Sequence, residues 1–447
     1  MVALSTCTVL LSALLAAPGD WLDARELGAS GSEFSTGAVT TAGNNQLTVA
    51  DPGDFPVGQG VMVSECLPRL TKQVIWGPRK QLTWEQPLKD KAELRGYDGT
   101  QSDWLVLFLD VPQGSRTFRW SEDLAATWHE TVAITGDWQP LRDGLEVKFN
   151  DLDWEEGYTV VFAARGQLVT TIDKIEGQQV TLHDTPTRSS NQAVMRHCDD
   201  AALQKAISQA IAERKHVYIP NGRYRLSRSL RVANPEGLVI EGANADHVLL
   251  DMSEGEGCCI QLVNGTEVTL RNLTMVGHSG FAQRDQCGAI NMKGSSYFWG
   301  FAAKNCNAVT TSGTQRVLIE NCHGRRMASE CFVAGCKSRG LPDQPNEQHT
   351  IALTYLRCSA IDCGRNAFND VNVGPENTKV LNCRIVDCGG CSWEGATRFM
   401  HFIGNYVRNA GSIAMGNVGT ANRDDSFAAL GAGQHIIADN VFEAGNR

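Results

Sequence analysis

The sequence is poor in proline, and it lacks long runs of any one kind of residue. Of 447 residues, 14 are proline and 44 are glycine, a balance that fits a β-rich chain with many tight bends. No stretch reaches the ~18 to 20 apolar residues that a membrane-spanning helix needs, so no membrane partner is expected. The 40 lysines and arginines are outnumbered by 50 acidic residues and form no basic run, so nucleic acid is not an expected partner either.

The signatures of several well-known reactions are also missing. The sequence contains no glycine-rich phosphate loop, no His-Glu-x-x-His zinc motif and no serine nucleophile elbow. His323-Gly324 and Asp424-Asp425 stand without the partner motifs of a polygalacturonase. The sequence predicts no metal ligands and requires no cofactor, although a lyase would admit Ca²⁺.

The first 20 residues allow two interpretations. Val2 to Ala17 is apolar and is followed by Pro18, but no positively charged segment precedes it. It is either a secretory signal or a short helix that caps a domain. A signal would make the protein secreted or periplasmic.

The C-terminal half contains an internal repeat. Short apolar runs end in Cys or Asn at five anchor positions, which are Cys322, Cys358, Cys383, Asn405 and Asn440. Two intervals between neighbouring anchors are short, at 25 residues (383−358) and 22 residues (405−383). The other two are 36 (358−322) and 35 (440−405), and each contains a polar stretch, Ser338 to Gln348 or Thr420 to Gly433. Runs rich in Val, Ile and Thr at this period predict strands bent into the coils of a parallel β-helix.

The repeat predicts columns of like residues inside the coils. Ten residues after successive anchors lie Phe332, Phe368, Trp393 and Met415, which we expect to form one buried column. The anchors themselves should form a second column, and Cys363 and Cys388 a third. Cys388-Gly-Gly-Cys391 is alternatively a redox or metal pair, but no second pair with zinc-ligand spacing follows, which favours stacking.

One helix is predicted just before the coils, from Asp199 to Ile207, with an acidic start that suits an N-cap. It leads into a strand that ends in Pro220-Asn221-Gly222-Arg223-Tyr224. A Gly28-Ala29 segment lies far upstream. Together these features resemble the entry motif of the pectate-lyase superfamily. The resemblance implies a right-handed parallel β-helix but no particular reaction, because lyases, hydrolases, isomerases and phage adhesins share this fold.

The number of residues between the Gly-Ala segment and the adjacent aspartates Asp199 and Asp200 predicts the domain organisation. In ordinary superfamily members the two are adjacent, so we expect residues 32–198 to be an all-β insertion near the N-terminus of the β-helix. The expected divisions are a signal-like or capping segment 1–20, a first β-helix segment 21–31, the insertion 32–198 (a small barrel with a nested β-sandwich at about 68–164) and the β-helix 199–447. The last repeat starts at His435 without a capping segment after it, which predicts a β-helix truncated at its C-terminus. Seven of the ten tryptophans lie in the nested unit, where they either fill its core or stack on sugars, the core being favoured.

The candidate site lies on the lateral face of the coils, where the two polar stretches would wall a groove. The catalytic candidates are Asp370, Glu394 and Arg398. The substrate-binding candidates are Asn369, Asn372, Asn417, Lys337 and His349, with Glu330 as a neighbour. Carboxylates on adjacent coils, at ~4.8 Å per coil, can divide acid and base roles. In a hydrolase, Asp370 and Glu394 would act as acid and base or nucleophile, whereas in a lyase Arg398 or Lys337 would abstract the proton.

Two functions remain open from the sequence. The first is a carbohydrate-active enzyme, a polysaccharide lyase or a glycoside hydrolase, that cleaves a polysaccharide in the lateral groove. The second is a non-catalytic β-helix that binds glycans or serves in surface adhesion. A groove with two carboxylates favours the first, and a groove lined by Asn, Ser and aromatic residues favours the second.

Overall fold

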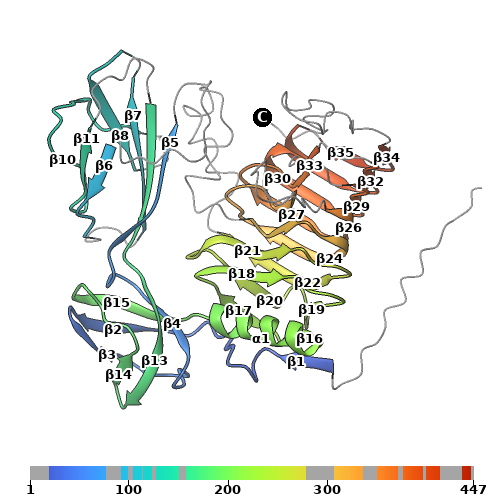
Figure 1. Cartoon of the computed structure of the whole chain (residues 1–447), viewed down its shortest axis with the longest axis horizontal. Coiled ribbons are helices and arrows are strands. Elements are labelled where there is room, and N and C mark those ends of the chain that lie inside the picture. Colours follow the sequence, from blue (N-terminus) through green and yellow to red (C-terminus); the bar gives the residue numbers. More distant parts are fainter. Residues whose placement is uncertain are drawn as a thin grey trace, which may run out of the picture.

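The computed structural model is almost entirely β-structure and contains a long stack of parallel strands (Figure 1). It describes residues 20–76, 92–98, 104–112, 114–122, 127–150, 158–277, 307–335, 350–370, 376–395, 399–412 and 435–443. The stack is a right-handed parallel β-helix, as the sequence predicts. The assignment to the pectate-lyase branch of this fold stays a prediction.

Two parallel sheets run the length of the described stack. In the first, called the long sheet, the main path is β1 (Trp21–Asp23), β16 (His216–Ile219), β19 (Val239–Gly242), β22 (Thr269–Val276), β24 (Gln315–Arg325), β26 (Ile351–Leu356), β29 (Lys379–Leu381), β32 (His401–Ile403) and β34 (Ile436–Ala438). Six further strands join it at its side, namely β17 (Gly222–Arg225), β20 (Val248–Asp251), β27 (Ser359–Cys363), β30 (Arg384–Cys391), β33 (Tyr406–Ser412) and β35 (Val441–Glu443). The second, called the lateral sheet, consists of β18 (Arg228–Ala233), β21 (Glu256–Val263), β23 (Val309–Ser312), β25 (Phe332–Gly335), β28 (Phe368–Asp370) and β31 (Trp393–Gly395).

The predicted aromatic column is confirmed for its described members. Phe332 pairs with Phe368, and Phe368 pairs with Trp393, in the register of the lateral sheet. The two phenylalanine rings stack with centroids 5.2 Å apart, and all three side chains are buried. Met415 lies outside the described residues.

The cysteine columns are also confirmed. Cys322, Cys358 and Cys383 are buried in the core, where desolvation raises the pKa of Cys322 to about 12. Asn405 continues this column by accepting the backbone N–H of Cys383 at 2.8 Å. Cys363 lies directly opposite Cys388 in the strand register, so Cys388 belongs to a stack. These buried thiols are packing groups of the core.

Helix α1 (Asp200–Glu213) covers the first coils with a buried stripe of Leu203, Ala206, Ile207 and Ala210. It ends at Arg214, whose left-handed backbone has φ of 55°. The expectation that the acidic start supplies a side-chain cap is wrong for Asp199, which occupies the N-cap position without capping. Its carboxylate has other donors, described below.

A closed barrel precedes the helix in the chain. Its strands are β13 (Leu168–Glu176), β14 (Gln179–Leu182), β3 (Asn44–Val49), β2 (Ser35–Thr41), β15 (Ser190–His197) and β4 (Gly60–Val63), in that order. Strand β1 lies before the barrel in sequence, yet it pairs in parallel with β16 after it. The chain therefore leaves the β-helix after its first strand and returns to it after the barrel.

Two antiparallel sheets lie beyond the barrel. One is β5 (Arg69–Trp76), β12 (Tyr158–Arg165), β7 (Trp104–Val111), β8 (Thr117–Ser121) and β9 (Val132–Ala133), and the other is β10 (Gln139–Pro140), β11 (Glu146–Phe149) and β6 (Ala92–Arg95). Their common core contains Leu107, Leu109, Val111, Phe118 and Phe149.

Three tryptophan side chains of this unit are described, and none of them is fully buried in that core. Trp120, Trp128 and Trp138 are only half-buried, and Trp128 and Trp138 lie beneath the guanidinium groups of Arg119 and Arg95. Aliphatic and phenylalanine side chains supply the interior instead. The expectation of core packing is therefore wrong for Trp128 and Trp138, whereas Trp120 packs against the core from its edge.

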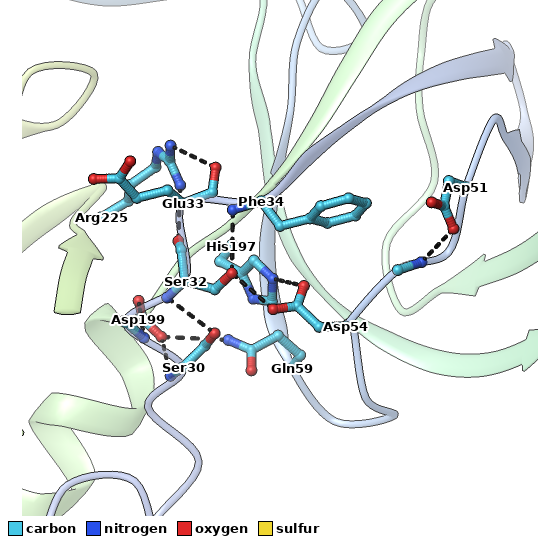
Figure 2. Close-up of polar contacts among 12 residues, drawn as sticks. Ser30, Ser32, Glu33, Phe34, Asp51, Asp54, Gln59, His197, Asp199 and Arg225 are labelled. Carbon is cyan, nitrogen blue, oxygen red and sulfur yellow. Dashed lines mark hydrogen bonds and ion pairs between the residues drawn. The ribbon is translucent and has the colours of Figure 1, made fainter. Parts of the chain in front are cut away.

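Figure 2 shows how the barrel is joined to the β-helix. Asp199 accepts the backbone N–H of Ser30 at 2.6 Å, the N–H of Gly31 at 3.3 Å and the side-chain amide of Gln59 at 3.4 Å. Burial raises the pKa of the Asp199 carboxyl group, and the two backbone donors oppose that rise. One buried aspartate thus fastens the Gly-Ala segment to the start of the helix, although 167 residues (32–198) lie between them in the chain.

Candidate functional site

The candidate site lies on the outer face of the lateral sheet. Asn369 and Glu394 are direct neighbours in the register between β28 and β31. Because side chains alternate along a strand, and Phe368 and Trp393 point into the core, these two point outward. Asn369 and Glu394 therefore lie side by side on neighbouring coils, and their membership of a functional site stays a prediction.

An arginine holds two glutamates together at this face. Arg365 donates from one terminal nitrogen to Glu394 Oε2 at 2.9 Å and from the other to Glu330 Oε1. All three residues are at most 8% exposed. Glu330 precedes β25, Arg365 precedes β28 and Glu394 lies in β31, so three successive coils each contribute one charge. We call these three residues the carboxylate cluster.

Amide and hydroxyl donors complete the cluster. Asn369 donates to Glu330 Oε1 at 3.0 Å, and Asn366 donates to Glu394 Oε2. The second oxygen of Glu330 accepts from Ser329 Oγ and from the Asn307 amide. Charged groups this deeply buried are stable only when they are paired and hydrogen-bonded, as both glutamates are.

Local backbone geometry fixes the amide of Asn366. Its Oδ1 atom accepts the backbone N–H of Cys391 at 2.8 Å. A Cβ atom at Gly390 would collide with this same Oδ1. Glycine at position 390 therefore leaves the space in which Asn366 reaches Glu394.

The charges of the cluster do not cancel. Two carboxylates and one guanidinium give a net charge of −1, from Glu330, Arg365 and Glu394 (−2 + 1). Taken by themselves, these three described groups attract hydroxyl donors and repel a carboxylate-bearing sugar. Two carboxylates around one cation can also divide the acid and base roles of a hydrolytic reaction.

Asp370 lies on the other side of the sheet from Glu394, which corrects the sequence prediction that both face the groove. It is fully buried, and it accepts a hydrogen bond from the indole N–H of Trp393 at 3.2 Å. Position 370 is two residues after the inward-pointing Phe368, so strand alternation turns Asp370 into the core as well. Desolvation raises the pKa of its carboxyl group to about 7, and the hydrogen bond from Trp393 opposes that rise. A carboxyl group in this position cannot touch a substrate on the lateral face.

The remaining predicted site residues lie outside the described residues. They are Arg398, Asn372, Asn417, Lys337 and His349, together with both stretches expected to wall the groove, Ser338 to Gln348 and Thr420 to Gly433. Their roles stay predictions.

Sequence reasoning missed Arg365 and Asn366. Both lie in the turn before β28, where no strand alternation indicates which way a side chain points. The signal in the sequence is charge. Arg365 lies in one repeat, and the repeats before and after it each contain a glutamate, Glu330 and Glu394, with which it can pair.

A second group of polar residues has the composition of a hydrolytic triad, but not its arrangement. At the barrel junction Ser32 Oγ donates to Asp54 Oδ2 at 2.7 Å, and His197 Nε2 lies 2.9 Å from Asp54 Oδ1 (Figure 2). Because the aspartate stands between the other two, the histidine cannot take a proton from the serine. His197 is also fully buried and stacked on Phe55. This group therefore ties the segments that contain Ser32 and Asp54 to barrel strand β15 and is not a nucleophilic site.

Two further properties concern metals and membranes. Among the residues that the structure describes, no three His, Cys, Asp or Glu side chains converge so that they could hold a metal ion. Over the same residues, no helix is long and apolar enough to span a bilayer.

Comparisons with known proteins identify similar folds. No family model matches the sequence, and no curated protein matches it. Among solved structures, the Agl-KA catalytic domain is 13% identical with a TM-score of 0.37, over 83% of this chain and 61% of that one. The adhesin PfbA of Streptococcus pneumoniae is 14% identical with a TM-score of 0.38, over 56% of this chain and 74% of the adhesin. The A-module of the mannuronan C-5 epimerase AlgE6 from Azotobacter vinelandii is 15% identical with a TM-score of 0.30, over 48% of this chain and 65% of the module. The chain thus spans less than two thirds of the Agl-KA catalytic domain. None of these likenesses assigns a function.

Proposed function

We propose that this protein is a glycoside hydrolase that cleaves a neutral polysaccharide on the outer face of the lateral sheet. The observation that carries the proposal is the carboxylate cluster, in which Glu330 and Glu394 are gathered around the Arg365 guanidinium from two coils that flank its own. Hydrolysis of a glycosidic bond typically needs two carboxyl groups on either side of the scissile bond. In this proposal Glu330 and Glu394 divide those roles, and Arg365 positions them.

The charge of the cluster favours a neutral substrate over a uronic acid polymer. With a net charge of −1 on three buried groups, a substrate carboxylate would meet repulsion in an environment of low polarity. Elimination from a uronate also needs a base next to a group that neutralises the substrate, whereas Arg365 is engaged by both glutamates. The proposal therefore selects hydrolysis over lyase chemistry.

The test is a panel of purified polysaccharides incubated with the full chain. We expect new reducing ends with at least one neutral polysaccharide, and no ultraviolet absorbance from unsaturated uronate. Unsaturated product from an anionic polysaccharide would contradict the proposal and identify a lyase. A secretory signal within residues 1–20 would place the protein outside the cytoplasm, which cell fractionation of the natural source tests.

Binding without turnover is the second candidate. It is favoured because the two glutamates already accept hydrogen bonds from Arg365, Asn366 and Asn369. Carboxylates engaged in this way are less available for proton transfer. In that case the lateral face would retain a polysaccharide and release no reducing ends. The same panel, read by binding as well as by product, separates the two candidates.

A further inference from the structure

A second row of polar side chains runs along the long sheet, away from the carboxylate cluster. The strand register aligns Tyr218, Glu241, Arg271 and Glu320 on four successive coils. Their strand neighbours Ile240, Leu270 and Ile319 lie in the core, so by alternation the four aligned side chains point outward. Figure 1 places β16, β19, β22 and β24 along one side of the stack. Strands β25, β28 and β31 belong to the other parallel sheet, the lateral sheet.

Glutamate and arginine side chains alternate along this row, and asparagine side chains lie between the ion pairs. Arg271 pairs with Glu241 at 2.6 Å, and Arg357 pairs with Glu320 one coil farther on. Asn321 donates to Asn272 Oδ1 at 2.9 Å, and this links the two ion pairs. These six residues line an open pocket of about 420 Å³, namely Glu241, Arg271, Asn272, Glu320, Asn321 and Arg357.

The corner of each coil holds the amides in place. Asn272 and Asn321 both have left-handed backbones, with φ of 59° and 50°, which asparagine tolerates better than most residues. A Cβ atom at Gly242 would collide with the backbone carbonyl of Asn272, so the preceding coil approaches closely at this point. The amides are thus fixed between the two ion pairs.

The pocket chemistry selects a neutral, hydroxyl-rich ligand. Two arginines and two glutamates balance one another, so the pocket offers no net charge to a phosphate, sulfate or uronate. Carboxylates accept from hydroxyl groups, and guanidinium and amide groups donate to them. The Nε–H of Arg271 is buried without a hydrogen-bond partner, which leaves a donor unsatisfied among these groups.

We propose that this row is a second binding site for a neutral polysaccharide, which lies along the axis of the β-helix. The half-buried ring of Tyr218, one coil before Glu241, offers an aromatic face for the apolar side of a sugar ring. Coils repeat at ~4.8 Å, so successive sugar units meet equivalent positions on successive coils. The site lies in a different sheet from the proposed hydrolytic cluster and does not depend on it.

The test is affinity electrophoresis of the full chain in gels that contain dextran, laminarin or galactomannan, with polygalacturonate as the anionic counterpart. The Glu394→Gln variant serves as the parent, so that polysaccharide is not consumed during the run. The two pocket variants are Arg271→Gln, in the pocket itself, and Tyr218→Ala, one coil beside it. They are compared with Arg316→Ala, which removes an ion pair with Glu267 outside the pocket. We expect at least one neutral polysaccharide to retard the parent, and each pocket variant to weaken that binding about tenfold while Arg316→Ala leaves it unchanged.

Three results would overturn the proposal. They are retardation by polygalacturonate alone, no retardation by any of the neutral polysaccharides, and retardation that both pocket variants leave intact. Thermal unfolding of each variant checks that it is folded, and Tyr218→Ala decides the matter if Arg271→Gln does not fold. Turnover is measured separately with the wild-type chain, so failure of the hydrolytic proposal is recognised independently of this site.

Discussion

Trp393 donates its indole N–H to the carboxyl group of Asp370 at 3.2 Å, inside the stack of coils. Both side chains are buried, and the second carboxyl oxygen of Asp370 has no hydrogen-bond partner in the described part of the chain. Trp393 therefore packs in the aromatic column and also provides a hydrogen bond to one oxygen of the buried carboxyl group. This pair links the packing of the coils to the protonation of one carboxyl group.

The first prediction is that stability falls as this acid ionises. The pKa of Asp370 is raised from 3.8 to about 7 by burial, so its contribution to stability is fully present below about pH 3.8 and is lost as the pH rises through about 7. Between about pH 4 and pH 7 we expect the free energy of unfolding to fall more steeply in the wild type than in Asp370→Asn, by up to about 1.4 kcal/mol per pH unit. Denaturant unfolding at several pH values measures this.

The matched control is Asp173→Asn, because Asp173 is 49% exposed on the barrel. That variant should follow the wild type. Identical pH profiles for the wild type and Asp370→Asn would contradict the prediction.

The second prediction concerns the aromatic column. Replacing Trp393 by Ala removes a large buried side chain between coils and the donor to Asp370, so we expect a loss of about 3 to 5 kcal/mol in the free energy of unfolding. Phe399→Ala is the control, because Phe399 is 42% exposed. Equal unfolding midpoints in denaturant for the two variants would refute the proposed role of Trp393.

The third prediction tests the junction between barrel and β-helix. Asp199→Ala leaves the backbone N–H groups of Ser30 and Gly31 without their acceptor, at an expected cost of about 1 to 3 kcal/mol. Limited proteolysis should then cut near the Gly-Ala segment sooner than in the wild type. In Asp51→Ala, which removes an exposed acceptor for Gly53 within its own turn, digestion should be unchanged. Equal digestion of all three proteins would show that Asp199 does not fasten the junction.

Much of the fold could be predicted because a solenoid repeats its packing. The ten-residue step from Cys358 to Phe368, repeated from Cys383 to Trp393, predicts both columns correctly. The prediction for Asp370 is wrong because Phe368, two residues earlier in the same strand, points inward. A step of two residues from an inward position leads inward again.

Other features could not be read from local patterns. The charge of Asp199 suggests a helix cap, but its true donors lie near position 30, across an insertion that no local pattern bridges. Arg365 lies in a turn, where side-chain direction depends on neighbouring coils. The domain boundaries at residues 32 and 198 stay predictions, which isolated expression of residues 32–198 would test.

The fourth prediction separates structure from chemistry in the carboxylate cluster. Arg365→Met leaves two buried glutamates without their cation, so we expect a loss of about 3 to 5 kcal/mol in the free energy of unfolding. Adding Glu330→Gln and Glu394→Gln to this variant removes the unpaired charges and should restore most of that stability. If the triple variant is no more stable than Arg365→Met, the two glutamates are not held by this arginine.

The most direct test of the proposed function is the rate at which reducing ends appear from a neutral polysaccharide substrate, measured in three variants beside the wild type. Glu330→Gln and Glu394→Gln keep the size of the side chain and remove its proton-transfer chemistry, so each should lower turnover by about 10²- to 10⁴-fold. Asp370→Asn, whose side chain lies in the core, should keep turnover close to that of the wild type at about pH 6. Full activity in both glutamine variants, or loss of activity in Asp370→Asn alone, would contradict the assignment of the active site to the outer face of the lateral sheet.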